Sequence, residues 1–323
     1  MAPDRRDFIR GLATGTLALG TGKAVAQAPA ATKPAPSAEV DRRLLGQTGK
    51  EVSILGLGLG SAFTKPYGKD RETGQKLLLR ALAHGVNYWD TARAYDPSEQ
   101  IIGEVVKGVR DQVFLVSKSG NRTYDGFMRD LETSLRNLQT DHLDLYHLHN
   151  FDPKKDKSLR KIERGAVKAA RKAKEQGLIR GFGVTGHSSP DILMECIRRF
   201  RPDAVLTIFP ASRPDKGRYE DELLPLARRH KMGVIAMKAI RRDRQSDLKG
   251  SDLIRYAMSL KGVCTTIVGL DTIAHLDENA AMATGFRPLK SRQRAAITRE
   301  VQLALGNYPA PWDMPGYTDG VVA

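Results

Sequence analysis

The feature that most constrains this chain is a regular alternation of short apolar segments with longer amphipathic ones. Eight β-rich apolar segments follow one another from residue 53 onwards: SILGLGLGS, NYWDTA, VFLVSK, LDLYHLHN, RGFGVTG, AVLTIFP, GVIAMK and CTTIVGL. Segments with apolar residues at helical spacing lie between them. Continuous apolar strands alternating with helices predict a parallel sheet that is buried on both faces. Eight such units in roughly 280 residues have the size and count of a (β/α)8 TIM barrel, an α/β fold.

A doubly wound open sheet is the rival architecture. It is disfavoured because no strand-like segment is followed by a GxGxxG turn into a helix. The Gly-rich stretch GLGLG, residues 56–60, is only the end of the first strand and is a weak signal by itself.

The N-terminus is not expected to belong to the fold. The stretch D-R-R-D-F-I-R, containing Arg5 and Arg6, resembles a twin-arginine (Tat) export signal, and a short apolar segment and small residues follow it. That segment is well short of the ~20 residues that span a bilayer, so no stable membrane anchor is expected after processing. We predict a signal peptide over residues 1–26, cleaved after Ala26, an Ala/Pro-rich linker over 27–40, and a barrel domain over 41–323. The implied partner is the Tat machinery and the implied location is the periplasm or cell exterior; a basic tail without this role is the alternative.

Charge and cysteine content narrow the possible partners. The 323 residues carry a net charge of +15, and residues 1–26 hold four Lys/Arg and two Asp/Glu, which leaves +13. Most of this charge lies on helix-like segments with interspersed Glu, a pattern typical of solvated helix faces. Because no nucleic-acid-binding motif accompanies the charge, nucleic acid is not an expected partner. Cys196 and Cys264 lack metal-ligand spacing and are expected to be buried thiols.

Polar residues stand where several predicted strands end. Asp90 ends the second strand and Tyr95 follows in the next loop, while Lys118 ends the third strand and His149 the fourth. A barrel collects the carboxyl ends of its strands on one rim, where barrel enzymes have their active sites. These four ionisable groups are therefore expected to converge.

The spacing of these residues resembles the signature of the aldo-keto reductases. The motif Asp90-Thr-Ala-x-x-Tyr95-x-x-Ser98-Glu99 is similar to it, as are Lys118 in LVSK and His149 in DLYHLH. The segment RRLLGQTGKEVSILGLG is similar to the family's entry hairpin, and the likeness extends from about Arg42 to Asn279. The resemblance implies an N-terminal β-hairpin, a barrel followed by a helical or loop tail, and catalysis by Asp90, Tyr95, Lys118 and His149.

Elementary chemistry assigns these four residues roles in carbonyl reduction. Hydride transfer leaves an alkoxide, which needs a proton donor within hydrogen-bond reach. A phenol is a weak acid at neutral pH, and a neighbouring ammonium favours its ionised form. Tyr95 would then be the general acid, Lys118 its activator, and Asp90 the group that holds the lysine. His149 would orient the carbonyl, and the hydride must come from a nicotinamide cofactor.

The cofactor residues match a branch of the family that carries a TGH motif. In this branch Thr185 and His187 would stand near the nicotinamide, where other members have Ser-Asn. The resemblance assigns cofactor contacts to ten residues in total: Thr185, His187, Phe209, Met237, Lys238, Gly269, Asp271, His275, Glu278 and Asn279. Relatives in this branch with an iron–sulfur cluster have a Cys-rich tail, whereas the tail here has no cysteine and no such cluster is expected.

The preference between the two dinucleotides is narrow. His275 stands where NADP-dependent members commonly have an arginine for the 2′-phosphate. Lys238, Arg241 or Arg242 could replace that arginine, so NADP(H) is narrowly favoured over NAD(H).

Large apolar residues could form a substrate pocket at the barrel mouth. Trp312, with Met314 and Tyr317, lies in a Pro/Gly-rich tail that could fold over the mouth or pack outside the barrel. The pocket residues predicted with it are Phe63, Trp89 and Phe151. The substrate itself stays open: an aldehyde, a ketone, a sugar, or an alcohol in the reverse direction.

Two other functions compete with the reductase. His147 and His149 form an HxH pair with His187 on the next strand, a pattern used by metal-dependent barrel hydrolases. That interpretation leaves the ordered tetrad without a role, and no metal is predicted. A cofactor-binding module for sensing or partner binding, with little catalysis, is the second alternative, which the altered cofactor contacts favour and the intact tetrad opposes.

Overall fold

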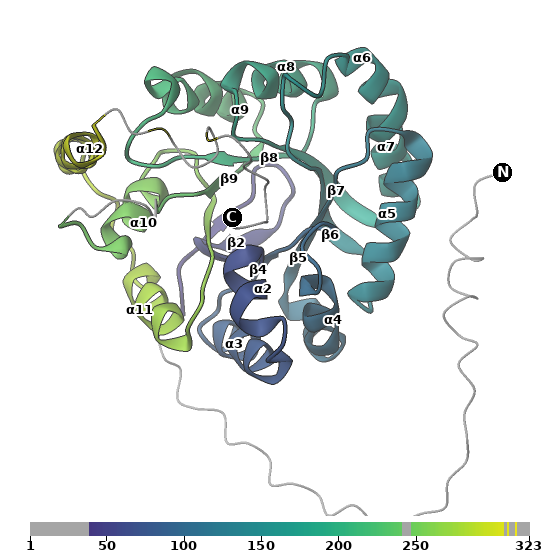
Figure 1. Ribbon diagram of the computed structural model, residues 1–323, viewed down its shortest axis with the longest axis horizontal. Coiled ribbons are helices and arrows are strands. Elements are labelled where there is room, and N and C mark those ends of the chain that lie inside the picture. The colour runs from purple at the N-terminus through teal and green to yellow at the C-terminus, as the bar shows by residue number, and fades with distance from the viewer. Residues whose placement is uncertain (1–38, 241–246, 307–308, 310–313, 315–323) are drawn as a thin grey trace, which may run out of the picture.

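The barrel is the dominant feature of the computed structural model, which describes residues 39–240, 247–306, 309 and 314. Eight parallel strands close in the order β10-β3-β4-β5-β6-β7-β8-β9 (Figure 1). Their bounds are β3 Leu55–Gly58, β4 Tyr88–Asp90, β5 Phe114–Ser119, β6 Leu143–Leu148, β7 Ile179–Thr185, β8 Ala204–Ile208, β9 Gly233–Met237 and β10 Thr265–Val268. The predicted (β/α)8 TIM barrel is confirmed.

Helices surround the barrel on all sides (Figure 1). They are α2 Ser61–Tyr67, α3 Arg71–Ala83, α4 Ser98–Val109, α5 Tyr124–Asn137, α6 Leu159–Ile162, α7 Lys168–Glu175, α8 Pro190–Phe200, α9 Leu224–Arg229, α10 Gly250–Met258, α11 Ile273–Ala283 and α12 Ser291–Leu305. Short 3-10 and π segments adjoin several of them: η1 Arg110–Gln112, η2 Glu163–Val167, η3 Asp215–Gly217 and η4 Tyr219–Leu223. Compared with the predicted pattern, α2 after the first barrel strand is additional, while α12 lies in the predicted helical or loop tail.

Side-chain caps explain why several helices begin where they do. Asp70 accepts a hydrogen bond from the backbone N–H of Thr73 at the start of α3, and Thr272 does the same for His275 at the start of α11. These bonds satisfy N–H groups that have no partner inside the helix. Among the described helices, none is both long and apolar enough to cross a membrane.

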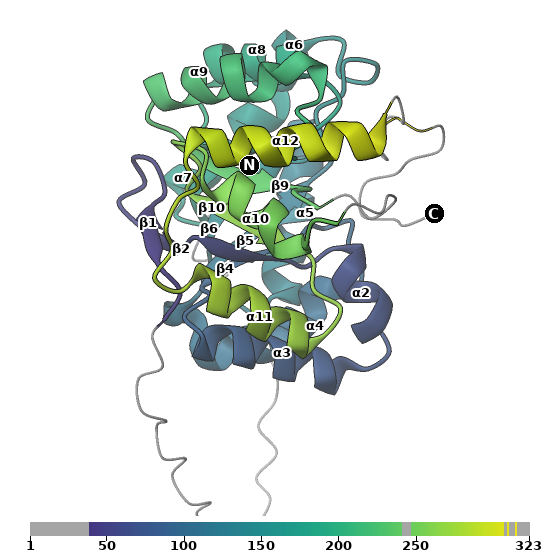
Figure 2. The ribbon, with the colours of Figure 1, turned by 90° about the vertical axis from the view of Figure 1, so that its left-hand side faces the viewer.

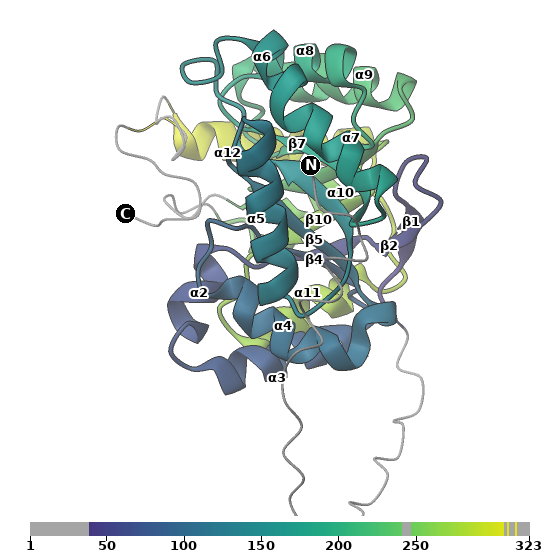
Figure 3. The same cartoon turned by 90° about the vertical axis from the view of Figure 1, so that its right-hand side faces the viewer.

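The predicted hairpin is confirmed and covers one end of the barrel. Strands β1 Arg42–Leu44 and β2 Glu51–Ser53 pair antiparallel. Figures 2 and 3 show them at one end of the barrel, with α2 at the other. Leu45 is fully buried against Gly233, where a Cβ would lie 2.7 Å from the leucine side chain. The hairpin therefore packs on the N-terminal end of the strands, and the C-terminal end carries the polar residues.

Glycines on the strands make room for large interior side chains. A Cβ on Gly56 would lie 3.0 Å from the ring of Tyr88, and one on Gly183 would lie 2.3 Å from Nδ1 of His147. In a barrel, inward and outward residues alternate along each strand. The Gly-rich first strand is therefore explained by close packing inside the barrel. Cys196 and Cys264 are both buried and unbridged, as expected.

Candidate active site

Four side chains from three neighbouring strand ends meet at the C-terminal rim. Asp90 ends β4, Lys118 lies near the end of β5, His149 directly follows β6, and Tyr95 lies in the loop before α4. The Lys118 ammonium donates to the Asp90 carboxylate and, at 2.7 Å, to the carbonyl of Thr91. The Tyr95 hydroxyl lies 3.2 Å from Nε2 of His149, and Nζ of Lys118 lies 5.1 Å from the centre of the tyrosine ring. The structure thus brings the four predicted residues together.

The Lys118–Asp90 pair is more deeply buried than Tyr95 and His149. Lys118 is 1% exposed and Asp90 2%, whereas Tyr95 is half-buried. Two buried opposite charges compensate each other, and removal of either would leave an uncompensated charge in the interior. The ammonium is therefore held beside the phenol, while the phenol remains within reach of a ligand.

The loop that carries Tyr95 is fixed by the Ser-Glu pair of the motif. Ser98 donates to the carbonyl of Leu59 at 2.7 Å, and its backbone N–H donates to the carbonyl of Tyr95 at 2.7 Å. Glu99 is 1% exposed and accepts hydrogen bonds from three side chains, those of Arg93, Ser117 and Asn137. The motif therefore supplies the phenol of Tyr95 and, through Ser98 and Glu99, also fixes the loop that carries it.

The HxH pair does not form the kind of site that a hydrolase needs. His147 points into the barrel interior, fully buried over Gly183 and beside Lys118 in the strand register. Burial first, and then the charges of Lys118 and His149, holds the pKa of His147 well below its usual range. Within the described part of the chain, no group of three or more His, Cys, Asp or Glu side chains is arranged to hold a metal ion.

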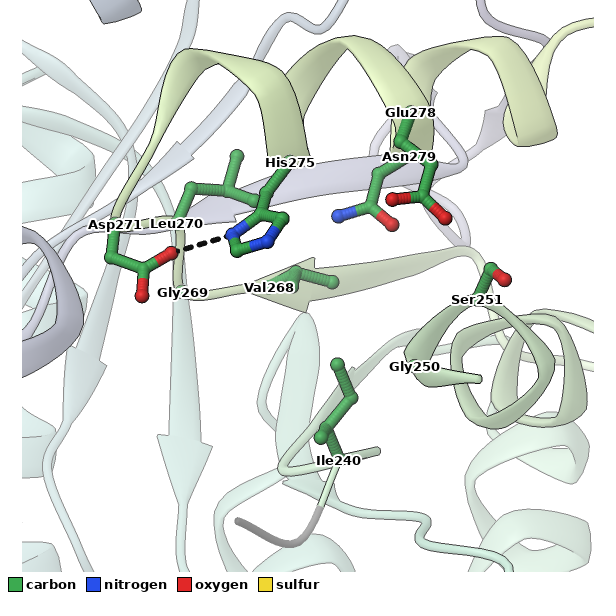
Figure 4. A pocket seen from close by; sticks show the side chains of 10 residues that line it. All are labelled: Ile240, Gly250, Ser251, Val268, Gly269, Leu270, Asp271, His275, Glu278 and Asn279. Atoms are coloured by element: carbon green, nitrogen blue, oxygen red, sulfur yellow. Dashed lines mark hydrogen bonds and ion pairs between the residues drawn. The ribbon is translucent and has the colours of Figure 1, made fainter. Parts of the chain in front are cut away.

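Beyond the tetrad, a cavity of about 370 Å³ lies between β10, α10 and α11 (Figure 4). Its lining residues are Ile240, Gly250, Ser251, Val268, Gly269, Leu270, Asp271, His275, Glu278 and Asn279. Gly250 and Ser251 form the first turn of α10, and the N-terminus of a helix favours anions through its N–H groups and dipole. The carboxylate of Asp271 lies 2.7 Å from Nδ1 of His275. The cavity therefore combines a helix N-terminus, which favours anions, with groups that accept hydrogen bonds.

Five of the ten predicted cofactor residues line this cavity, namely Gly269, Asp271, His275, Glu278 and Asn279. The other five lie at or just beyond the ends of β7, β8 and β9: Thr185, His187, Phe209, Met237 and Lys238. The hydroxyl of Thr185 accepts from the backbone N–H of Asn150 at 2.7 Å, and Lys238 has a left-handed φ of 54°. All ten thus lie at strand ends or in the loops and helix that follow them.

The three described residues of the predicted substrate pocket need correction, because each is fully buried in packing. Trp89 alternates with the inward-facing Asp90 and donates its indole N–H to the carbonyl of Val86 at 3.0 Å. Phe63 packs on Tyr67 within α2, with ring centres 5.3 Å apart. Phe151 lies beneath a guanidinium instead of facing the mouth. Trp312 and Tyr317 lie outside the described residues, and Met314 is exposed.

Sequence reasoning missed two kinds of functional candidate. Ser251 and Ile240 line the cavity, and the start of a helix after the seventh strand was a usable signal for Ser251. Arg122, whose guanidinium lies 4.4 Å from the centre of the Phe151 ring, had no signal, because His149, Phe151 and Asp156 lie 27 to 34 residues away in the sequence.

Comparison with known proteins agrees with this geometry. A model of the aldo/keto reductase family matches residues 54–246, more than half of the chain. The aldo-keto reductase YhdN of Bacillus subtilis is 33% identical over 207 residues, covering 59% of each chain. The methylglyoxal reductase YeaE of Escherichia coli is 29% identical over 286 residues, covering 81% of this chain and 93% of its own. The chain belongs to the aldo/keto reductase family.

A solved structure extends the likeness to the fold. An aldo-keto reductase from Klebsiella pneumoniae in complex with NADPH superposes with a TM-score of 0.66 at 24% identity, covering 85% of this chain and 98% of that one. Coverage is lower for some curated relatives: the chain spans only 59% of YhdN and 63% of a second Bacillus subtilis oxidoreductase.

Proposed function

We propose that this protein is a nicotinamide-dependent oxidoreductase that interconverts a carbonyl and an alcohol. The observation that carries the proposal is the arrangement of Tyr95, whose hydroxyl lies 3.2 Å from His149 beside the buried Lys118–Asp90 pair. Sensing or partner binding alone would not require an ammonium buried beneath a phenol. A metal-dependent hydrolase would have no role for this ammonium and phenol.

The mechanism follows from the positions of the donors. A bound nicotinamide supplies the hydride. A carbonyl oxygen that lies beside the Tyr95 hydroxyl and Nε2 of His149 can be polarised by both, because the two groups are 3.2 Å apart and can reach a common acceptor. Tyr95 donates its proton to the developing alkoxide, and the Lys118 ammonium offsets the charge left on the phenolate. In alcohol oxidation Tyr95 accepts that proton instead.

The described residues fit the adenosine end of a dinucleotide. The first turn of α10 offers backbone N–H groups at Gly250 and Ser251 for a phosphate, and Asn279 and Glu278 offer groups for an adenine or ribose. The cavity of about 370 Å³ has the size of a site for part of such a ligand.

For the choice of dinucleotide we retain the narrow preference for NADP(H). It rests on Lys238 or on Arg241 and Arg242, two arginines that lie outside the described residues but directly follow Ile240 of the cavity wall. Asp271 and Glu278 oppose it, since a carboxylate repels a 2′-phosphate and can accept from a 2′-hydroxyl. We therefore expect a modest ratio of affinities, and Asp271→Asn should raise the affinity for NADPH more than that for NADH.

The proposed substrate is a small carbonyl compound, an aldehyde, ketone or sugar, or the matching alcohol. Support comes from YeaE, a methylglyoxal reductase that resembles this chain over most of its length. The test is consumption of NADPH and NADH by the mature protein with a panel of aldehydes and ketones, and formation of both reduced cofactors with alcohols. Absence of turnover in both directions, with either dinucleotide, would contradict the proposal.

We further propose export through the Tat pathway with the cofactor already bound, on the basis of Arg5 and Arg6 and the A-x-A site ending at Ala26. The test is fractionation of cells that produce the full chain or its Arg5→Lys/Arg6→Lys variant. Export predicts a shortened, dinucleotide-loaded wild type in the periplasm and a retained variant. An unprocessed wild type in the cytoplasm would contradict it.

A further inference from the structure

A buried ion pair lies directly behind the histidine of the tetrad. The guanidinium of Arg122, in the loop between β5 and α5, donates to both carboxylate oxygens of Asp156, from Nε at 2.7 Å and from Nη2 at 3.0 Å. The side chain of Asp156 is 6% exposed. Two parallel charge-assisted bonds fix the plane of a guanidinium as well as its position. Arg122 is therefore held rigidly at this rim.

Nη1 of Arg122 donates to the carbonyl of Gly120 at 3.3 Å, and Nη2 also reaches the backbone directly after the His149 side chain. Nη2 donates to the carbonyl of His149 at 2.8 Å and to that of Asn150 at 3.3 Å. The backbone N–H of His149 donates to Ser119 of β5 at 2.8 Å. The peptide groups flanking the imidazole are thus tied to fixed elements on both sides.

The backbone at this point needs such restraint. Asn150 has a left-handed φ of 53°, a conformation that persists in non-glycine residues when the surroundings enforce it. Phe151 follows, buried beneath the Arg122 guanidinium at 4.4 Å, and its N–H donates to the carbonyl of Thr185 at 2.7 Å. The chain therefore turns sharply immediately after His149, and Arg122 contacts three successive residues of that turn.

We propose that Arg122, anchored by Asp156, is a positioning residue for His149: it fixes the turn 149–151 and thereby holds the imidazole at the Tyr95 hydroxyl. This inference rests on the proposed function, since it assigns the geometry of the same active site. Arg122 contacts Asp156 and the turn 149–151, so its effect on the reaction passes through His149.

The chain offers a matched control at the opposite end of the same strand. Arg110 pairs with Asp144 at 2.8 Å, is similarly buried, and donates to the carbonyls of Val113 and His142. It restrains the entry to β6 as Arg122 restrains the exit, but no tetrad residue follows it. Arg110→Met therefore reports what the loss of a comparable ion pair does by itself.

The test is a double-mutant cycle on kcat/KM. We expect Arg122→Met to lower kcat/KM about 100-fold in the wild-type background, because small displacements of a catalytic group have effects of this size. In a His149→Gln background the same change should lower kcat/KM by less than about threefold, since the histidine that Arg122 positions is already absent. Arg122→Lys should recover part of the loss, and Arg110→Met should have little effect in either background. Equal losses from Arg122→Met in both backgrounds would overturn the proposal.

Two further measurements keep the outcome decisive. If Arg122→Met does not fold, Arg122→Met/Asp156→Leu removes both buried charges, and the same cycle applies to it. Imidazole NMR signals of 15N-histidine-labelled protein, with His149 assigned through His149→Gln, need no turnover. The His149 signals should shift in the Arg122 variants and not in Arg110→Met; unchanged signals would overturn the proposal. A wild type without turnover would contradict the proposed function, while the NMR result would still decide the role of Arg122.

Discussion

The two ends of the barrel are built from different kinds of contact. At the N-terminal end, the β1–β2 hairpin packs Leu45 against Gly233, and Arg43 donates to the carbonyls of Met258 and Val263 at 2.9 and 2.8 Å. At the C-terminal end lie the buried Lys118–Asp90 pair and, directly after His149, the left-handed residue Asn150. The charges of Lys118 and Asp90 lose their hydration on burial, which costs stability.

The difference shows that one end of the barrel mainly contributes stability and the other mainly contributes chemistry. The end covered by the hairpin pairs its polar groups and buries apolar side chains, so its substitutions should change the free energy of unfolding. The other end holds charged groups in fixed positions at the expense of stability, as expected where function conflicts with local preference. Substitution of a half-buried group at this end, such as Tyr95, should change the reaction more than the fold.

The largest expected effect is at the C-terminal end. Tyr95→Phe removes the proton donor, so kcat/KM for carbonyl reduction should fall about 1000-fold, while the free energy of unfolding changes by less than about 1 kcal/mol. Steady-state kinetics and urea unfolding measure the two effects. Tyr146→Phe is the control: Tyr146 faces away from the barrel interior on β6, 3.3 Å from the hydroxyl of Ser134. Comparable activity in Tyr95→Phe and wild type would remove Tyr95 from the mechanism.

The opposite pattern is expected at the N-terminal end of β6. Arg110→Met leaves Asp144, whose side chain is 12% exposed, without its cation. The free energy of unfolding should fall by about 3 kcal/mol, because removal of one partner strands the other charge. Under conditions where the variant remains folded, kcat/KM should stay within about twofold of the wild type. A large loss of kcat/KM in fully folded protein would contradict the division between the ends.

Gly183, inside the barrel, tests how tightly the interior between the two ends is packed. Gly183→Ala places a methyl group 2.3 Å from Nδ1 of His147 and 2.9 Å from a backbone oxygen, so the interior must shift. We expect a loss of about 2 kcal/mol in the free energy of unfolding from overpacking. Gly108→Ala, on the exposed side of α4 with no atom within 4 Å of the new methyl group, should instead be neutral or slightly stabilising. Equal effects of the two substitutions would rule out the packing explanation.

The smallest expected effect concerns pH. Because the pKa of His147 is lowered in the folded state, the unfolded chain takes up a proton below about pH 6.5 that the folded chain does not. Folding therefore loses stability as the pH falls, by about 1 kcal/mol between about pH 6.5 and 5.5 for this group. His147→Leu should remove that part of the slope in urea unfolding measured across this range. Parallel curves for the two proteins would show that His147 does not contribute.

Much of the architecture could be predicted from local patterns. Strand and helix periodicity predicted the barrel, and the strand ends predicted that Asp90, Lys118 and His149 would share a rim, since parallel strands all end on one side. The family motif added Tyr95 and the cavity residues around His275. The aromatic pocket was wrong for Trp89, Phe63 and Phe151, because size and hydrophobicity do not reveal which way a side chain faces.

What the sequence determined by itself is the order of elements and the presence of the catalytic residue types at strand ends, because both depend on short-range periodicity and on a closed parallel sheet. What only the tertiary structure decided are contacts between distant residues. Arg122 contacts Asp156, which lies 34 residues further along the sequence, and the backbone of His149, which lies 27 residues further along. Ser251 at the start of α10 and His275 of α11 line one cavity, which neither segment forms alone. Such contacts depend on the packing of whole elements, which no local pattern encodes.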